Sequence, residues 1–321
     1  MLQNINKQLE RFMPLITPTS VVLGVLFADS LIDFTFLIPW VFAFITFAGS
    51  LGSNFSSFKD SLKHPLPLFI ILIVLHILMP AWAWTVGHVT FNGDVETITG
   101  LVLGMAIPTG ISSLIWVTIY RGNIPLTLSI ILLDTFLSPF IVPFTLSVMV
   151  GSSVEMDVFS IMSGLFWMVV LPSILGMLLN QYTNGKVKEK WSPRLAPFSK
   201  LGLGMVVMIN GAAVAPYLRN IDLKLVMITV TVFFIAFTGY LFSFAIAKLF
   251  KGERETVIAL TFTGGMRNIS AGAVLAVAYF PPAVAVPVVI AMLFQQVLAS
   301  LYGYLVDRHF NKQILTKSHS M

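Results

Sequence analysis

Long runs of apolar residues, separated by short polar segments, recur along the chain from residue 14 to residue 306. A helix needs about 20 consecutive apolar residues to span the hydrocarbon core of a bilayer. The pattern therefore predicts an all-α polytopic membrane protein with ten transmembrane helices. The predicted spans are residues 14–28, 34–54, 65–87, 97–120, 123–149, 158–180, 196–217, 223–249, 254–279 and 283–306.

Two of these spans contain residues that interrupt a helix. The ninth span carries Gly264 and Gly265 just before Arg267, and each glycine weakens a helix by about 1 kcal/mol relative to alanine. The fourth span carries Pro108 and Gly110; proline removes a helical hydrogen bond and glycine loosens the backbone. In lipid, an interrupted helix is tolerated only where its freed backbone groups are buried in protein or line a wet cavity. Both breaks are therefore expected inside the protein.

The ten predicted spans form two groups of five, spans 1–5 and spans 6–10, and the basic segment 181–200 follows span 6. Because five is odd, the second group enters the membrane in the opposite sense, which is the inverted-repeat plan of many secondary transporters. The interrupted fourth and ninth spans hold equivalent places in the two five-helix repeats, and such matched breaks point to a transporter's binding site. We expect residues 1–180 to contain spans 1–5 and span 6, residues 181–200 to form a cytoplasmic loop, and residues 201–321 to contain spans 7–10 and a cytoplasmic tail.

The distribution of charge supports this topology. The chain is 57% hydrophobic and only 10% charged, whereas soluble proteins carry about 25% charged residues. Sixteen of the 19 basic residues fall on one predicted side; Arg219 and Lys224 fall on the other, and Arg267 lies inside the membrane. Cytoplasmic loops are enriched in Lys and Arg, so both termini are predicted to be cytoplasmic, in a bacterial inner or plasma membrane. The net charge of +5 then implies no nucleic-acid partner.

Several classes of function are not supported by the sequence. The absence of cysteine excludes disulfides, thiolate metal sites and cysteine catalysis. We find no His-Glu-x-x-His, Gly-x-Ser-x-Gly, carboxylate pair or P-loop. Residues 1–13 are polar and amphipathic without a cleavage pattern, which predicts mature chain rather than a signal peptide. We expect neither an enzyme nor a cofactor.

Polar side chains gather at the two breaks and in the span that follows the second break. They are Thr109, Ser112 and Ser113 in the fourth span, Thr263, Arg267, Asn268 and Ser270 in the ninth, and Gln295 and Gln296 in the tenth. Helix N-termini and a cation attract anions, so the set predicts a site for a small organic anion, a carboxylate or a sulfonate. Alternatively, the hydroxyls serve only as interhelical hydrogen bonds. The adjacent glutamines point about 100° apart on a helix, so we expect one of them to face the site.

Three ionisable residues lie deep in predicted spans. Asp134 in the fifth span and Arg267 have opposite charges, and a lone charge at mid-bilayer costs about 2.5–3.5 kcal/mol. We therefore expect the two to pair, either as a structural lock or as a proton-titratable site. His76 in the third span is interpreted first as a core histidine bonded to a carbonyl, with a proton relay as the alternative.

Over nearly its whole length the chain resembles the bile acid/sodium symporter family. The matching segments are Gly265-Met266-Arg267-Asn268-Ile269-Ser270, the break from Pro108 to Ser113, Arg121-Gly122-Asn123 and Leu137-Ser138-Pro139. The resemblance implies a panel domain of spans 1, 2, 6 and 7 and a core domain of spans 3–5 and 8–10, in which the broken helices 4 and 9 cross. It implies alternating access, with substrate bound between the domains by Asn268, Gln295 and Gln296, near Thr109 and Ser112.

The chain departs from this family at the sodium ligands. The family uses a Glu, a Gln and an Asn at the breaks, a third-span Gln and fifth-span hydroxyls. In this chain the corresponding residues are Thr263, Arg267, Leu114, Leu75 and Ile131. Of the ligands, Ser113 and Thr127 remain. We therefore expect both sodium sites to be lost, with the Arg267 guanidinium in their place and Asp134 as its counter-ion.

Three hypotheses for the function follow from these observations. The first is a secondary transporter of small organic anions that works as a uniporter or an exchanger, or that couples to protons. The second is a sodium-coupled symporter with rebuilt sites, and the third is a membrane sensor of the same fold that does not transport. Pantoate, ketoacids and sulfonates are favoured over bile acids as cargo.

Overall fold

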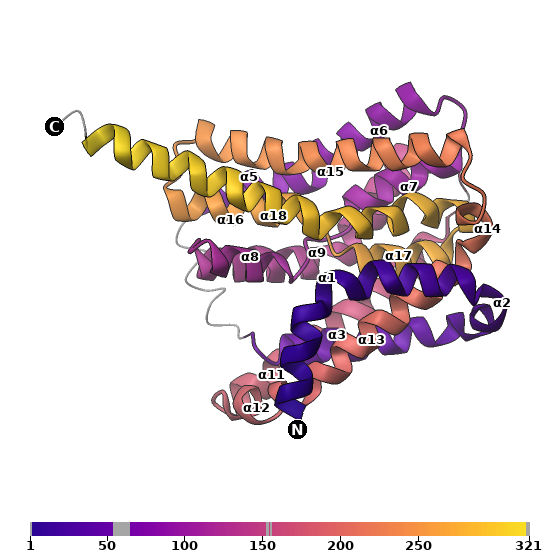
Figure 1. The fold of residues 1–321 in the computed structure, drawn as a ribbon, viewed down its shortest axis with the longest axis horizontal. Coiled ribbons are helices and arrows are strands. Elements are labelled where there is room, and N and C mark those ends of the chain that lie inside the picture. The colour runs from indigo at the N-terminus through magenta and orange to yellow at the C-terminus, as the bar shows by residue number, and fades with distance from the viewer. Residues whose placement is uncertain (1, 54–64, 152–153, 155, 319–321) are drawn as a thin grey trace.

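The computed structural model describes residues 2–53, 65–151, 154 and 156–318, and every regular element among them is a helix (Figure 1). Lys59 and Lys63, two of the 16 basic residues on the predicted cytoplasmic side, lie outside the described residues. In chain order the helices are α1 (Leu2–Leu26), α2 (Ala28–Leu31), η1 (Ile32–Leu37), α3 (Ile38–Ser50), α5 (Pro65–Ile73), η2 (Val74–Leu78), α6 (Met79–Thr90), α7 (Val95–Ala106), α8 (Ser113–Ile119), α9 (Ile124–Val150), α10 (Val158–Leu165), η3 (Phe166–Val170), α11 (Leu171–Tyr182), α12 (Lys186–Lys190), α13 (Ser192–Ala213), α14 (Ala215–Leu218), α15 (Leu223–Leu249), α16 (Arg254–Gly265), α17 (Ile269–Tyr279) and α18 (Pro282–Ser318).

Among the described residues, seven helical segments are long and apolar enough to cross a membrane. They are 28–50, 65–90, 124–150, 158–182, 192–213, 223–249 and 282–310. Three shorter apolar helices, 15–26, 95–106 and 269–279, fall within the first, fourth and ninth predicted spans. A polytopic all-helical membrane protein is therefore confirmed, and the count of ten crossings stays a prediction.

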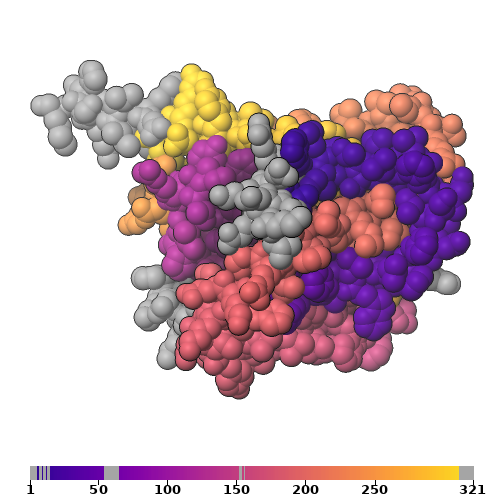
Figure 2. All heavy atoms as spheres, turned by 60° about the horizontal axis from the view of Figure 1, so that its bottom comes forward, coloured from indigo at the N-terminus to yellow at the C-terminus, as the bar shows by residue number. Residues whose placement is uncertain are grey.

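The helices pack in two groups. Helices α1, α3, α11 and α13 contact one another and are called the first group (Figure 1). Helices α6, α7, α9 and α15–α18 pack together around the two breaks and are called the crossing group. In Figure 2 the N-terminal helices, in indigo, lie beside the pink to orange α11–α13 segment of the first group. The predicted loop 181–200 contains α12 and the start of α13.

Both predicted helix breaks are present. Helix α7 ends because Ile107, which precedes Pro108, takes an extended conformation with ψ of 151°; proline disfavours the helical conformation of the residue before it. Helix α16 ends at Gly265, and Met266 is extended with ψ of 124°. The side chain of Asn268 then caps α17 by accepting a hydrogen bond from the Ala271 N–H, with an N···O distance of 3.3 Å.

The glycine pair also allows α16 to pack closely on α15. A Cβ at Gly264 would lie 2.1 Å from Ser243 Oγ, and a Cβ at Gly265 would lie 2.2 Å from the Tyr240 ring. Tyr240 is fully buried and cannot retreat without disturbing its neighbours. The two glycines therefore both loosen the helix and bring it close to its neighbour.

We predict that Gly265→Ala lowers the thermal unfolding midpoint of the detergent-solubilised protein, because the new methyl group would overlap the Tyr240 ring. Overpacking of this kind costs about 1–3 kcal/mol. The matched control is Gly104→Ala, whose Cβ would meet nothing within 4 Å. A variant Gly265→Ala as stable as Gly104→Ala would show that the close approach is not needed.

Candidate functional site

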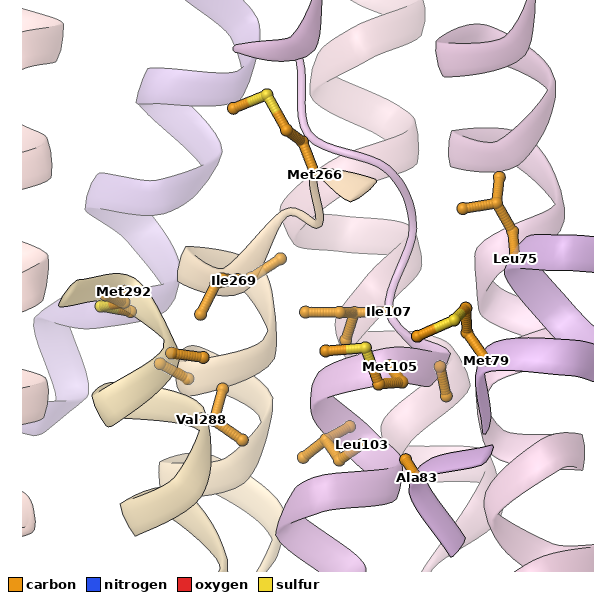
Figure 3. Packing of buried hydrophobic residues seen from close by; sticks show 14 of the residues in the cluster. Leu75, Met79, Ala83, Leu103, Met105, Ile107, Met266, Ile269, Val288 and Met292 are labelled. Atoms are coloured by element: carbon orange, nitrogen blue, oxygen red, sulfur yellow. The ribbon is translucent and has the colours of Figure 1, made fainter. Parts of the chain in front are cut away.

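The two broken helices meet through their backbones. Thr109 and Arg267 form an antiparallel β-bridge, flanked by hydrogen bonds from the Gly110 N–H to the Met266 carbonyl (3.2 Å) and from the Asn268 N–H to the Pro108 carbonyl (2.8 Å). A Cβ at Gly110 would lie 2.9 Å from the Arg267 carbonyl oxygen, so this approach requires glycine. The bridge satisfies backbone groups that the breaks would otherwise leave unpaired in lipid. Figure 3 shows Ile107 and Ile269 beside each other at the two breaks, with Met266 on the segment that links α16 and α17.

Thr109 links the bridge to its surroundings. Its hydroxyl lies within donor distance of the carbonyl oxygens of Thr263 (2.7 Å) and Met266 (2.9 Å). Its backbone N–H donates to Asp134 Oδ2 across 2.6 Å. One residue of the first break therefore contacts both the end of α16 and the middle of α9.

Asp134 does not pair directly with Arg267, which corrects our expectation. The carboxylate is fully buried, and its second oxygen, Oδ1, lies 2.8 Å from His76 Nε2. This is a close contact whose angle departs from that of a good hydrogen bond, and it becomes an ion pair when the His76 ring is protonated. No ion pair joins the two described residues Asp134 and Arg267, although the carboxylate still acts electrostatically on the guanidinium. The carboxylate instead contacts the His76 ring and accepts a hydrogen bond from the Thr109 N–H.

A π-helical turn, η2, positions His76 and a free carbonyl. In this turn the Met79 N–H bonds back to the Val74 carbonyl, and residue 80 is proline, which has no N–H. The Leu75 carbonyl is therefore left without its usual helical donor. Arg267 Nη2 donates to this carbonyl across 3.4 Å, and Figure 3 shows Leu75 and Met79 on the helix beside the break.

The Arg267 side chain is turned into the protein. The residue is 2% exposed, and Nη1 has no hydrogen-bond partner among the described residues. Its backbone N–H donates to Gln295 Oε1 (3.1 Å). The guanidinium therefore lies beside the crossing, within the core, and not in lipid or in a loop.

A cavity of about 230 Å³ opens beside the crossing. All five residues that we expected to bind substrate line it: Thr109, Ser112, Asn268, Gln295 and Gln296. Arg267 and Ser270 also contribute to its lining. Its opposite wall comes from the first group and carries hydroxyls that the sequence analysis missed: Thr17, Thr46, Ser50, Ser53 and Ser173. The cavity therefore lies between the two groups of helices.

Both glutamines line this cavity, so the expectation that only one would face it is wrong. Gln295 Oε1 accepts from the Arg267 backbone, and Gln296 Oε1 accepts from Trp116 Nε1 of α8 (3.0 Å). The two side chains thus reach different halves of the broken helices while both border the same space.

The other expected ion-site residues lie behind the cavity. Thr263 Oγ1 donates to the Ala259 carbonyl, and Thr127 Oγ1 donates to the Asn123 carbonyl, both at 2.8 Å. Ser113 Oγ is buried without a partner among the described residues. In the described part of the chain, no group of three or more His, Asp or Glu side chains is placed to hold a metal ion.

We predict that Thr109→Val destabilises the protein, because the Thr263 carbonyl would lose the hydroxyl that donates to it. An unpaired buried polar group costs about 1–3 kcal/mol, which thermal unfolding in detergent would detect. Thr118→Val is the control, since Thr118 donates only to its own helix, at the exposed end of α8. Equal midpoints for the two variants would contradict the role of this hydroxyl.

Comparison with known proteins identifies relatives of this chain. The model for "Sodium Bile acid symporter family" matches residues 39–221. The Bacillus subtilis protein YbaS is 57% identical over 306 residues, which cover 95% of this chain and all of that protein. The B. subtilis protein YocS, named a sodium-dependent transporter, is 25% identical over 91% of each chain. A rice chloroplast protein named a probable sodium/metabolite cotransporter, BASS1, is 29% identical over 76% of this chain and 59% of its own length.

Proposed function

The chain belongs to the sodium bile acid symporter family, and from this premise we propose that it is a secondary transporter of small organic anions. It is a membrane transporter of that family and not an enzyme. The observation that carries the proposal is the cavity between the two helix groups, with the crossing on one wall and a set of hydroxyls on the other.

We propose alternating access as the mechanism that this arrangement supports. The first group corresponds to the proposed panel domain and the crossing group to the proposed core domain, in a chain of ten spans with two inverted repeats. In that plan the pairs α7–α8 and α16–α17 would be the equivalent broken helices of the two repeats. Movement of one group past the other would open the cavity to each side of the membrane in turn. We further propose that both termini face the cytoplasm, since most basic residues lie on that side.

An anion is favoured by the charges around the cavity. The positive end of the α17 dipole lies at Asn268, which borders the cavity. Arg267 borders the same cavity, and its guanidinium brings a permanent positive charge to the crossing. Hydroxyl and amide groups that line the cavity then supply hydrogen bonds to a carboxylate or a sulfonate.

We propose that the Arg267 guanidinium takes the structural place of sodium. It is buried, bonds a carbonyl freed by the π-helical turn, and stands at a position where the family has a sodium ligand. A tethered cation can stabilise the crossing but cannot carry an ion gradient. The name of YocS favours a second candidate, a sodium-coupled symporter whose sites are rebuilt from other residues.

Counterflow in proteoliposomes tests the transport proposal. Liposomes loaded with unlabelled pantoate, a ketoacid or a small sulfonate should take up the same labelled anion transiently against its gradient. Asn268→Ala should slow this exchange at least several-fold, because Asn268 borders the cavity. Thr85→Ala, on an exposed position of α6, is the control. Absence of counterflow with all three classes of anion would favour a sensor that does not transport.

We predict that this counterflow changes less than twofold when external sodium is replaced by potassium, because Arg267 supplies a fixed charge. The double variant Thr263→Glu/Arg267→Gln, which restores the family's carboxylate and amide at these positions, should gain sodium dependence. The measurement is the initial rate of counterflow from 0 to about 100 mM sodium. Because salt in this range also screens surface charges, potassium replaces the missing sodium so that the ionic strength stays constant. A steep sodium dependence of the unaltered protein would support the rebuilt-site symporter instead.

A further inference from the structure

Three ionisable side chains meet at the crossing: Asp134, Arg267 and His76. The first two are needed by the architecture, because Asp134 accepts from the Thr109 N–H and Arg267 donates to the Leu75 carbonyl. His76 has no such role in the backbone. Its side chain is only 8% exposed, although it is a titratable group. His76 is therefore the ionisable group at the crossing that backbone hydrogen bonding does not account for.

The geometry indicates where His76 carries its proton. Nε2 lies 2.8 Å from the Asp134 carboxylate, and a carboxylate can only accept, so Nε2 carries the hydrogen. In the neutral ring Nδ1 is then an acceptor with a free lone pair. Nδ1 is buried and has no partner among the described residues. A proton can therefore add at Nδ1 without breaking an existing contact.

We propose that His76 Nδ1 is the proton-binding site through which this protein couples transport of its anion to protons. This inference rests on the proposed function and adds its coupling ion. With His76 neutral, the charges of Asp134 and Arg267 cancel. An incoming monovalent anion leaves the buried cluster one charge negative, and one proton on Nδ1 restores neutrality. The anion and the proton therefore bind cooperatively, and each raises the affinity for the other.

Histidine suits this role better than Asp134 does. Both carboxylate oxygens of Asp134 already face donors, the Thr109 N–H and the His76 ring. A proton on Oδ2 would point at an N–H group. Histidine is also the side chain that ordinarily changes charge between pH 5 and 8.

The elements packed against His76 bring few other titratable groups to it. The buried ones are Asp134 of α9, Arg267 of the second break and Tyr240 of α15, whose hydroxyl lies 3.3 Å from the Gln295 carbonyl. The remaining charged groups of α7, α15 and α16 lie in the end turns of those helices: Glu96, Lys224, Lys248, Arg254 and Glu255. In the described part of the chain, proton binding at the crossing therefore depends on His76 and its two charged neighbours.

Nitrogen-15 NMR of histidine-labelled protein tests proton binding without any substrate. The Nδ1 signal that disappears in His76→Gln should move when the pH is lowered from 8 to 5, as proton uptake at Nδ1 requires. Glutamine preserves a donor toward Asp134 but cannot take up a proton at this position. A His76 signal that stays unchanged over this range would overturn the inference, whether or not the protein transports anions.

Uptake into proteoliposomes tests the coupling. The labelled anion that gives counterflow should accumulate about tenfold for each unit by which the outside is more acidic than the inside, as expected for one proton per anion. Protein-free liposomes define the passive baseline. His76→Gln should lose the accumulation, whereas His88→Gln should keep both counterflow and accumulation, since the His88 ring lies against Trp84 near the end of α6. Counterflow without acid-driven accumulation in the unaltered protein would overturn proton coupling and leave the transport proposal standing.

Discussion

The antiparallel bridge between Thr109 and Arg267 is the interaction on which the rest of the site depends. In a membrane the freed backbone groups of two broken helices must find partners inside the protein. Here each break supplies the partners of the other, and the Thr109 hydroxyl contacts the end of α16. This arrangement allows polar side chains and helix termini to lie beside a cavity without leaving the backbone groups of the breaks unpaired.

The charged residues reinforce this bridge from behind. Asp134 holds the backbone of one broken helix, and Arg267 reaches from the other to the Leu75 carbonyl of η2. Leu75 and His76 are neighbours on that π-helical turn. Arg267 contacts the first and Asp134 the second, so the turn connects the two charged residues, which do not contact each other directly. We therefore propose that the permanent positive charge of Arg267 stabilises the crossing, as a bound sodium ion would in a sodium site.

Much of this site could be predicted from the sequence, because interruptions and charges are rare in apolar spans. Gly264, Gly265 and Pro108 marked the breaks, and most of the polar residues beside them line one cavity, whereas Thr263 and Ser113 do not. The partner of Asp134 could not be predicted, since it depends on a π-helical turn that apolar periodicity does not reveal. The hydroxyls of the opposite wall were missed because Ser and Thr usually bond within their own helices, as Thr46 does. Only the packing of the two helix groups shows that they face a common space.

The central claim is that a fixed guanidinium occupies the structural place of a mobile metal ion at the crossing. Equilibrium binding of ²²Na⁺ to the purified protein, measured by scintillation proximity, tests it most directly and does not require the substrate. The account predicts no saturable binding, because the ligand hydroxyls of Thr263 and Thr127 are engaged on their own helices and Arg267 brings a like charge. Saturable binding of one or two sodium ions per chain would contradict it.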